Sequence, residues 1–156
     1  MVKFYNFDIV FAEVPDQTTL AVNISECPNR CPGCHSPHLM QSVGEPLDEE
    51  AIALLLDRYG RSVTCFCFMG GDARPAEIAA LAGVVRRLCP SMLTAWYSGR
   101  DELPDGVDPR AFDYIKLGRY VESLGGLSSP STNQRLYRIA ADGEMEDLTY
   151  RFGHNR

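Results

Sequence analysis

The sequence predicts a single α/β domain built as a partial, open (β/α) barrel of parallel strands with helices outside, preceded by a β-hairpin. Short apolar runs typical of buried strands alternate with amphipathic helical segments over most of the chain. Two strand-like runs separated by Pro15-Asp16-Gln17 open the sequence. The 156 residues provide one core, whereas a complete eight-unit barrel needs about 250 residues. We therefore expect one domain over residues 1–156 that builds only part of a barrel.

The opening hairpin is expected from residues 3–14 and 18–24. In the first run the apolar residues Phe7, Ile9 and Phe11 alternate with other positions, which is the period of a strand. The second run leads directly to Cys27. A loop at the carboxyl end of a strand is where open α/β sheets and barrels place their sites.

The loop after this hairpin carries three cysteines, Cys27, Cys31 and Cys34, with the spacing C-x3-C-x2-C. Cysteine thiolates are the usual protein ligands of iron-sulfur clusters, and three of them leave one metal position open for a small molecule. The alternative is a structural zinc site, completed by His35 or His38. The spacing alone leaves both open.

A helix is expected after Asp48. Asp48 can cap the amino end, the two glutamates that follow favour the positive first turn, and Gly60 can end the helix. The residues predicted for its inner face share one side of the helical wheel: Ile52, Leu55, Leu56 and Tyr59.

The nearly continuous apolar run 63–69 predicts a strand buried on both faces. Cys65 and Cys67 lie on the same face of this strand, and we interpret them, with Cys89, as small buried core residues rather than as extra metal ligands. A helix should follow from Pro75. Its expected inner face consists of Ile78, Leu81, Val85 and Leu88.

Gly70-Gly71-Asp72 joins this strand to its helix. Paired glycines leave the backbone open to close approach by a ligand, although they also suit a tight turn with Asp72 at the helix start. In consecutive parallel units the carboxyl ends of the two strands lie side by side, so both glycines are expected to face the cysteine loop.

Two further strands, over residues 92–97 and 112–117, should end at the same edge. Ser98 follows the first of them and either contacts a ligand or only forms a turn with Gly99. Lys116 lies within the second, apolar strand, where an ammonium group needs a counter-charge or a path to solvent. That counter-charge is either a bound carboxylate or a structural acid such as Asp113.

The last third of the chain is expected to hold a Gly- and Ser-rich loop over 119–131, a strand over 136–140 and a hairpin turn at Asp142-Gly143. Thr132-Asn133-Gln134-Arg135 places amide and guanidinium donors before that strand. Such donors suit a peptide backbone or a carboxylate, but they also suit a polar loop that caps a strand. Residues 151–156 are predicted to be a frayed tail.

The net charge of −6 argues against a nucleic-acid partner, because phosphate backbones are bound by clustered Lys and Arg. The sequence contains no apolar run long enough to cross a bilayer and does not open with a secretion signal. We therefore expect a cytoplasmic protein without a membrane partner, in a reducing compartment where cysteines serve as ligands or core residues rather than as disulfides.

The cysteine motif after the first core strand, followed by Gly-Gly-acidic after the next, resembles the radical S-adenosylmethionine superfamily. Within it, three segments are similar to the activating proteins of anaerobic ribonucleotide reductase. These segments are Pro32-Gly33-Cys34-His35, Asp113-Tyr-Ile-Lys116-Leu-Gly118 and Thr132-Asn133-Gln134-Arg135.

This resemblance implies that Cys27, Cys31 and Cys34 ligate a 4Fe-4S cluster whose remaining iron binds S-adenosylmethionine. An electron from a low-potential donor would cleave the cofactor to methionine and a 5'-deoxyadenosyl radical. That radical would take a hydrogen from a glycine of the partner, the large subunit of an anaerobic ribonucleotide reductase. The implied cofactor-binding residues are Gly70, Gly71, Asp72, Ser98 and Lys116, with Asp72 where the superfamily carries Glu.

Two alternatives remain beside this glycyl-radical activase. One is a small radical enzyme of the same superfamily that acts on a small molecule. The other is a zinc-stabilised binding module without catalysis, which would hold zinc and would not cleave S-adenosylmethionine.

Overall fold

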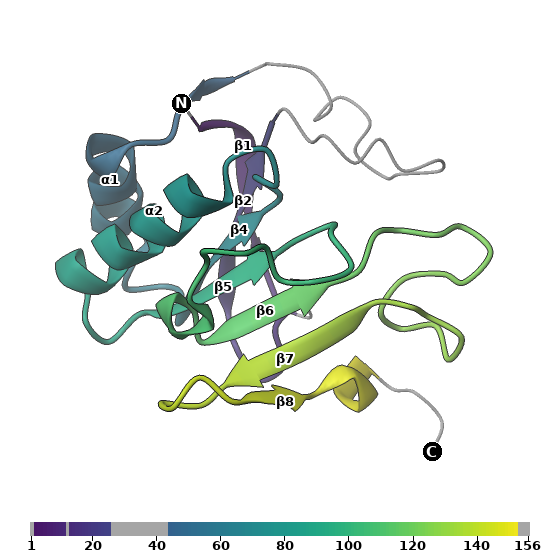
Figure 1. Cartoon of the computed structure of the whole chain (residues 1–156). Coiled ribbons are helices and arrows are strands. Elements are labelled where there is room, and N and C mark those ends of the chain that lie inside the picture. Colours follow the sequence, from purple (N-terminus) through teal and green to yellow (C-terminus); the bar gives the residue numbers. More distant parts are fainter. Residues whose placement is uncertain (1, 12, 26–43, 153–156) are drawn as a thin grey trace.

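The computed structural model describes residues 2–11, 13–25 and 44–152 and shows one eight-stranded sheet with two α-helices (Figure 1). Along the chain its elements are β1 (Lys3–Val10), β2 (Thr19–Ile24), β3 (Glu45–Pro46), α1 (Glu49–Tyr59), β4 (Cys65–Met69), α2 (Pro75–Leu88), β5 (Leu93–Tyr97), the 3-10 helix η2 (Pro109–Ala111), β6 (Tyr114–Leu117), β7 (Arg135–Ile139), β8 (Met145–Asp147) and the 3-10 helix η3 (Thr149–Phe152).

The strands lie in the order β3-β1-β2-β4-β5-β6-β7-β8. Neighbouring strands from β2 to β6 are parallel, and the pairs on either side of this group are antiparallel. The predicted amino-terminal hairpin is confirmed, since β1 pairs antiparallel with β2. The α/β class is confirmed as well. These pairings describe an open sheet with β3 and β8 at its edges, and they do not show a barrel.

Helix α1 begins and ends where its capping residues predict. The Asp48 carboxylate accepts a hydrogen bond from the Ala51 amide at 2.9 Å, and the Gly60 amide donates to the Leu56 carbonyl. An acceptor at the first turn satisfies an amide that has no partner within the helix. Ile52 and Leu55 are buried, so α1 turns the predicted face to the sheet.

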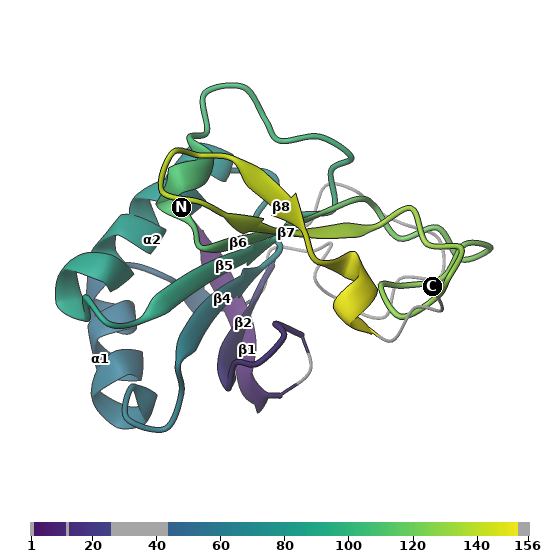
Figure 2. The ribbon, with the colours of Figure 1, turned by 90° about the horizontal axis from the view of Figure 1, so that it is seen from below.

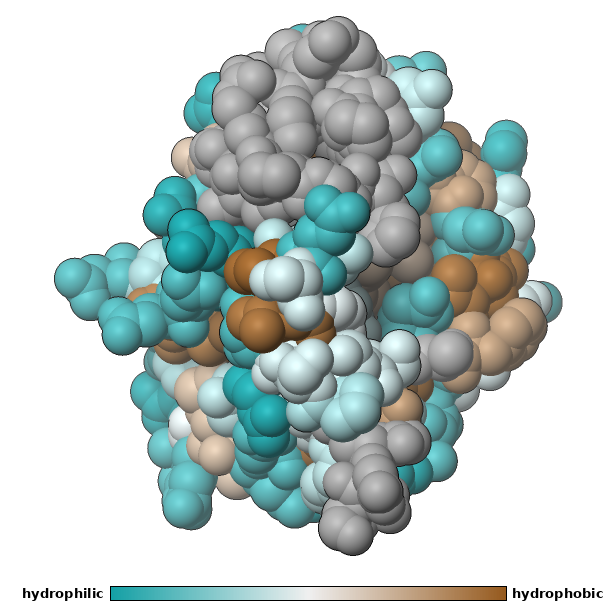
Figure 3. All heavy atoms as spheres, turned by 90° about the vertical axis from the view of Figure 1, so that its right-hand side faces the viewer, coloured by the Kyte–Doolittle hydropathy of each residue, from teal (hydrophilic) through white to brown (hydrophobic). Residues whose placement is uncertain are grey.

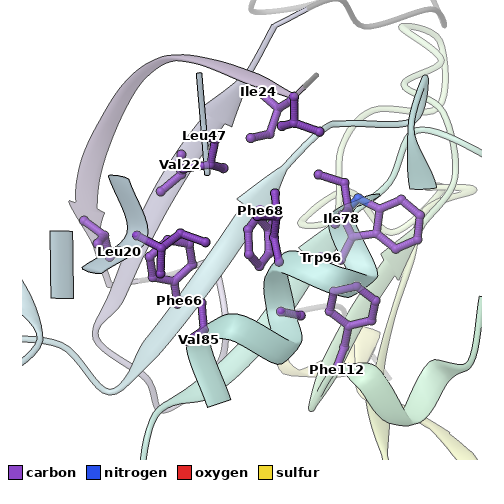
Figure 4. Close-up of a cluster of buried hydrophobic side chains, with 14 of the residues drawn as sticks. Leu20, Val22, Ile24, Leu47, Phe66, Phe68, Ile78, Val85, Trp96 and Phe112 are labelled. Atoms are coloured by element: carbon purple, nitrogen blue, oxygen red, sulfur yellow. The ribbon is translucent and has the colours of Figure 1, made fainter. Parts of the chain in front are cut away.

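Both helices cover the same face of the sheet (Figures 1 and 2). The core beneath them is rich in aromatic rings: Phe66 and Phe68 of β4 are fully buried, and Trp96 stacks on Phe112 with 5.5 Å between ring centroids (Figure 4). Leu88, predicted to face inward, is 40% exposed. It is the last residue of α2, so no further helical turn covers it.

The opposite face of the sheet carries a second, smaller cluster. Cys65 and Cys67 are fully buried there as free thiols, packed with residues such as Val14 and Leu136. This agrees with their interpretation as core residues. Cys89 is only half-buried and packs against the cluster beneath the helices.

At the carboxyl terminus, Tyr150 to Phe152 lie in η3, and Arg151 forms an ion pair with Asp16 at 2.6 Å. The first residues of the expected tail are therefore attached to the β1–β2 connection. Within the described ranges, no helix is both long and apolar enough to cross a membrane.

Candidate cofactor-binding edge

The carboxyl ends of four parallel strands meet at one edge of the sheet, because β2, β4, β5 and β6 are consecutive neighbours with the same direction. A Cβ placed on Gly70 would lie 3.4 Å from the Ile24 carbonyl oxygen. The residues at the ends of β2 and β4 therefore lie next to each other. The edge faces the right of Figure 1, and Figure 3 looks onto that side, where hydrophilic residues surround smaller hydrophobic groups. We call it the carboxyl edge.

The predicted metal ligands Cys27, Cys31 and Cys34 lie outside the described residues, as do His35 and His38. The structure places the chain as far as Ser25, two positions before Cys27 in the sequence. Among the residues that are described, no group of three or more His, Cys, Asp or Glu side chains could hold a metal ion.

Gly70 and Gly71 both adopt left-handed backbone angles, with φ of 103° and 88°. A Cβ on Gly71 would also lie 2.5 Å from Cδ1 of Ile78, so this turn packs tightly against α2. Both positions therefore require glycine. The Gly70 carbonyl accepts a hydrogen bond from the Trp96 indole at 2.7 Å. This contact was not predicted, although the chain's only tryptophan, two residues before Ser98, could have drawn attention to it.

Asp72 is buried, with 1% of its surface exposed. Its Oδ1 accepts a hydrogen bond from Ser98 Oγ at 2.5 Å, and its Oδ2 accepts one from the Gly99 amide at 2.8 Å. A charged acceptor makes both bonds stronger than bonds between neutral groups. The structure thus brings Asp72 and Ser98 together and joins the ends of β4 and β5.

Lys116 is 8% exposed, and its Nζ donates to the carbonyl oxygens of Ser98 at 2.9 Å and Gly118 at 3.0 Å. The ammonium group also lies 5.6 Å from the centre of the Tyr97 ring, within the range of a cation–π contact. The carboxylate of Asp113, one of the counter-charges considered from the sequence, instead accepts from the Thr94 amide and pairs with Arg86.

The Thr132–Arg135 segment bonds to its own chain. Asn133 Nδ2 donates to the Arg119 carbonyl, Gln134 Nε2 donates to the Gly118 carbonyl, and Arg135 pairs with Asp147 of β8. These contacts match a polar loop that fastens the start of β7 to the end of β6. Among the residues that the structure describes, the buried Oδ1 of Asn133 finds no hydrogen-bond partner.

Burial changes the ionisation of the two thiols of β4. Burial raises the pKa of Cys65 to about 12, with a smaller contribution from Asp113, and it raises the pKa of Cys67 well above its usual range. Both groups are therefore neutral thiols at pH 7. A neutral thiol is a poor metal ligand, which again argues against a metal role for these two cysteines.

A groove of about 740 Å³ adjoins the carboxyl edge where the chain leaves β5. It is lined by residues 99–105 and Arg119, and it is open to solvent. Its volume lies within the range of small-molecule sites. The groove begins at Gly99, whose amide Asp72 holds.

Comparison of the chain with family models, curated proteins and solved structures finds no match. The resemblance to radical S-adenosylmethionine enzymes therefore rests on the sequence motifs.

Proposed function

We propose that this protein is a radical S-adenosylmethionine enzyme that generates a glycyl radical on a partner anaerobic ribonucleotide reductase. The observation that carries the proposal is the convergence of strand ends at the carboxyl edge. The strand that leads to the cysteine motif is the hydrogen-bonded, parallel neighbour of the strand that ends in Gly70 and Gly71. Ser98 and Lys116 follow at the next two strand ends.

The described residues fit the amino-acid part of S-adenosylmethionine, which carries an ammonium and a carboxylate group. Gly70 and Gly71 have backbone angles that only glycine adopts readily, and neither carries a side chain of its own that would stand between the backbone and a ligand. Lys116 offers a positive charge to a carboxylate. Asp72 and Ser98 complete the same edge. This chemistry supports the proposal independently of the three cysteines.

In this proposal Cys27, Cys31 and Cys34 hold a 4Fe-4S cluster. The cluster and S-adenosylmethionine supply one-electron cleavage chemistry when they are bound, with the electron coming from a low-potential donor. The protein's own residues orient the cofactor and enclose it. Gly70 and Gly71 let the backbone approach the cofactor, and Lys116 neutralises its carboxylate.

The proposal also gives the open sheet a meaning. In this proposal the open sheet serves as a partial (β/α) barrel that leaves one side available to a large substrate. A glycine-bearing loop of a partner protein could reach the carboxyl edge from that side, whereas a closed barrel would exclude it. The variant proposal, a radical enzyme for a small molecule, predicts S-adenosylmethionine cleavage without activation of any reductase.

The first test is the iron, sulfide and zinc content of protein purified without oxygen, with the visible spectrum before and after dithionite. We expect about four irons per chain and a brown colour that bleaches on reduction. Adding S-adenosylmethionine, a reductant and an anaerobic ribonucleotide reductase should then yield 5'-deoxyadenosine and a glycyl radical signal in electron paramagnetic resonance.

Matched variants identify the ligands. Cys27→Ala, Cys31→Ala and Cys34→Ala should each lose most of the iron and all cofactor cleavage. Cys89→Ala, which removes a half-buried thiol at the end of α2, outside the cysteine motif, should retain both. One zinc per chain without iron would favour the binding module instead, and full activity in any of the three variants would refute the assignment.

A further inference from the structure

We infer that Asp72 is a positioning residue, which acts through Ser98 to hold the Lys116 ammonium at the carboxyl edge rather than contacting the cofactor itself. The inference rests on the proposed function, because it specifies how that site is kept in shape. Its basis is a continuous set of hydrogen bonds across three strand ends.

The first link joins Asp72 to β5. Its two carboxylate oxygens accept from Ser98 Oγ at 2.5 Å and from the Gly99 amide at 2.8 Å. Ser98 Oγ also accepts from the Arg100 amide at 3.1 Å, and the Arg100 guanidinium donates to the Asp72 carbonyl at 3.0 Å. Three of these bonds thus fix the turn after β5 to the turn after β4, and the bond between Ser98 and Arg100 lies within the turn after β5.

The second link joins that turn to Lys116. The Ser98 carbonyl accepts from Lys116 Nζ at 2.9 Å. A shift of Ser98 therefore moves one of the two carbonyls that fasten the ammonium, and the other belongs to Gly118, the residue that follows β6. Residues that orient the groups contacting a ligand commonly change affinity by about 10- to 100-fold when they are replaced.

The turn has little room to adapt. Asp72 is 1% exposed and Ser98 is fully buried. The preceding Gly71 already lies against Ile78, since a Cβ there would come within 2.5 Å of the isoleucine side chain. Glu at position 72 would push the carboxylate about 1.5 Å further, one carbon–carbon bond, into Ser98 and Gly99. The side chain of Asp72 therefore has the length that fits between its own turn and the residues that follow β5.

The decisive variant is Asp72→Glu, which installs the superfamily's acid. A positioning role predicts that S-adenosylmethionine binds about tenfold more weakly, at unchanged iron content, and that Ser98→Ala has a similar effect. The double variant should also lose only about tenfold, because both changes break the same link. Asp72→Asn, which matches Asp in size, should retain part of the affinity, and Asp57→Asn on the exposed face of α1 serves as control.

Amide hydrogen exchange of the segment around Gly99 supplies a readout that does not depend on the cofactor. We expect faster exchange in Asp72→Asn and Ser98→Ala, and no change in Asp57→Asn. Wild-type affinity or better in Asp72→Glu, or an unaffected Ser98→Ala, would overturn the inference while leaving the proposed function intact. A wild-type protein that binds no S-adenosylmethionine would overturn both, whatever the exchange rates show.

Discussion

Two regions of the sheet bury ionisable side chains, and they do so in opposite ways. At the carboxyl edge, Asp72 and Lys116 are fixed by hydrogen bonds to backbone and hydroxyl groups of neighbouring strand ends. On the face away from the helices, Cys65 and Cys67 are packed among apolar side chains, and burial raises the pKa of both thiols.

The difference shows that burial of a titratable group does not by itself mark a site. A buried charge is tolerated when groups of fixed geometry compensate its lost hydration, whereas an uncompensated group remains neutral. At the carboxyl edge such compensation retains polar side chains in buried positions. The thiols of β4 serve the core.

The largest expected effect is a loss of stability at alkaline pH, caused by the two neutral thiols of β4. Cys65 has a pKa raised from 9.0 to about 12, so between these values the unfolded chain releases a proton that the folded chain keeps. The contribution of these thiols to stability is therefore fully present below about pH 9. The free energy of unfolding then decreases as the pH rises, by up to about 1.4 kcal/mol per pH unit for each such thiol. Urea unfolding between pH 8 and 11 measures the slope.

The control for this experiment is Cys65→Ala combined with Cys67→Ala. Its unfolding free energy should vary less with pH over the same interval. If the slope is the same in both proteins, the two thiols are not the titrating groups, and the contrast between the regions fails.

Lys116→Met tests the charged member of the carboxyl edge. The change removes the ammonium group that donates hydrogen bonds to the carbonyls of Ser98 and Gly118. We expect the free energy of unfolding to fall by about 2 kcal/mol. Arg138→Met on the adjacent β7 is the matched control, because its ion pair with Glu146 is 56% exposed on both sides. That variant should change stability by under about 0.5 kcal/mol. Equal effects in chemical denaturation would contradict the assigned difference.

Gln134→Leu should have the smallest effect of the three. It removes a neutral hydrogen bond to the Gly118 carbonyl and is expected to lower the unfolding free energy by about 1 kcal/mol. Thermal unfolding of Gln134→Leu measures this loss, and Arg135→Leu, which changes a more exposed neighbour, is the control. A cost above that of Lys116→Met would mean that the charge is not the dominant feature of the edge.

Much of this fold could be predicted because local signals agreed with the tertiary structure. Asp48 and Gly60 delimit α1, and the Pro15-Asp16 turn joins the two strands of the hairpin. The alternation of apolar residues did not predict burial in β1, where Phe7 is 36% exposed, and Phe11 lies beyond the strand and is 74% exposed. The juxtaposition of Gly70 with the end of β2 followed from the parallel order alone. The face of Leu88 was predicted wrongly, since periodicity does not indicate where a helix stops covering its sheet.

The contacts within the edge could not be predicted. Sequence spacing places Asp72, Ser98 and Lys116 at neighbouring strand ends, but it does not say which oxygen each donor reaches. The bond from Trp96 to Gly70 depends on side-chain directions that only the packed core determines. For Lys116 the sequence left a bound carboxylate and a structural acid open, and the carbonyl partners of its ammonium emerged only from the fold.

Trp96 also gives the protein a built-in optical reporter. It is the only tryptophan in the sequence, it is fully buried, and its indole N–H is bonded to the Gly70 carbonyl while its ring stacks on Phe112. Its fluorescence therefore comes from a single, dry environment at the turn after β4. Emission wavelength and quenching can follow events at this turn without any label.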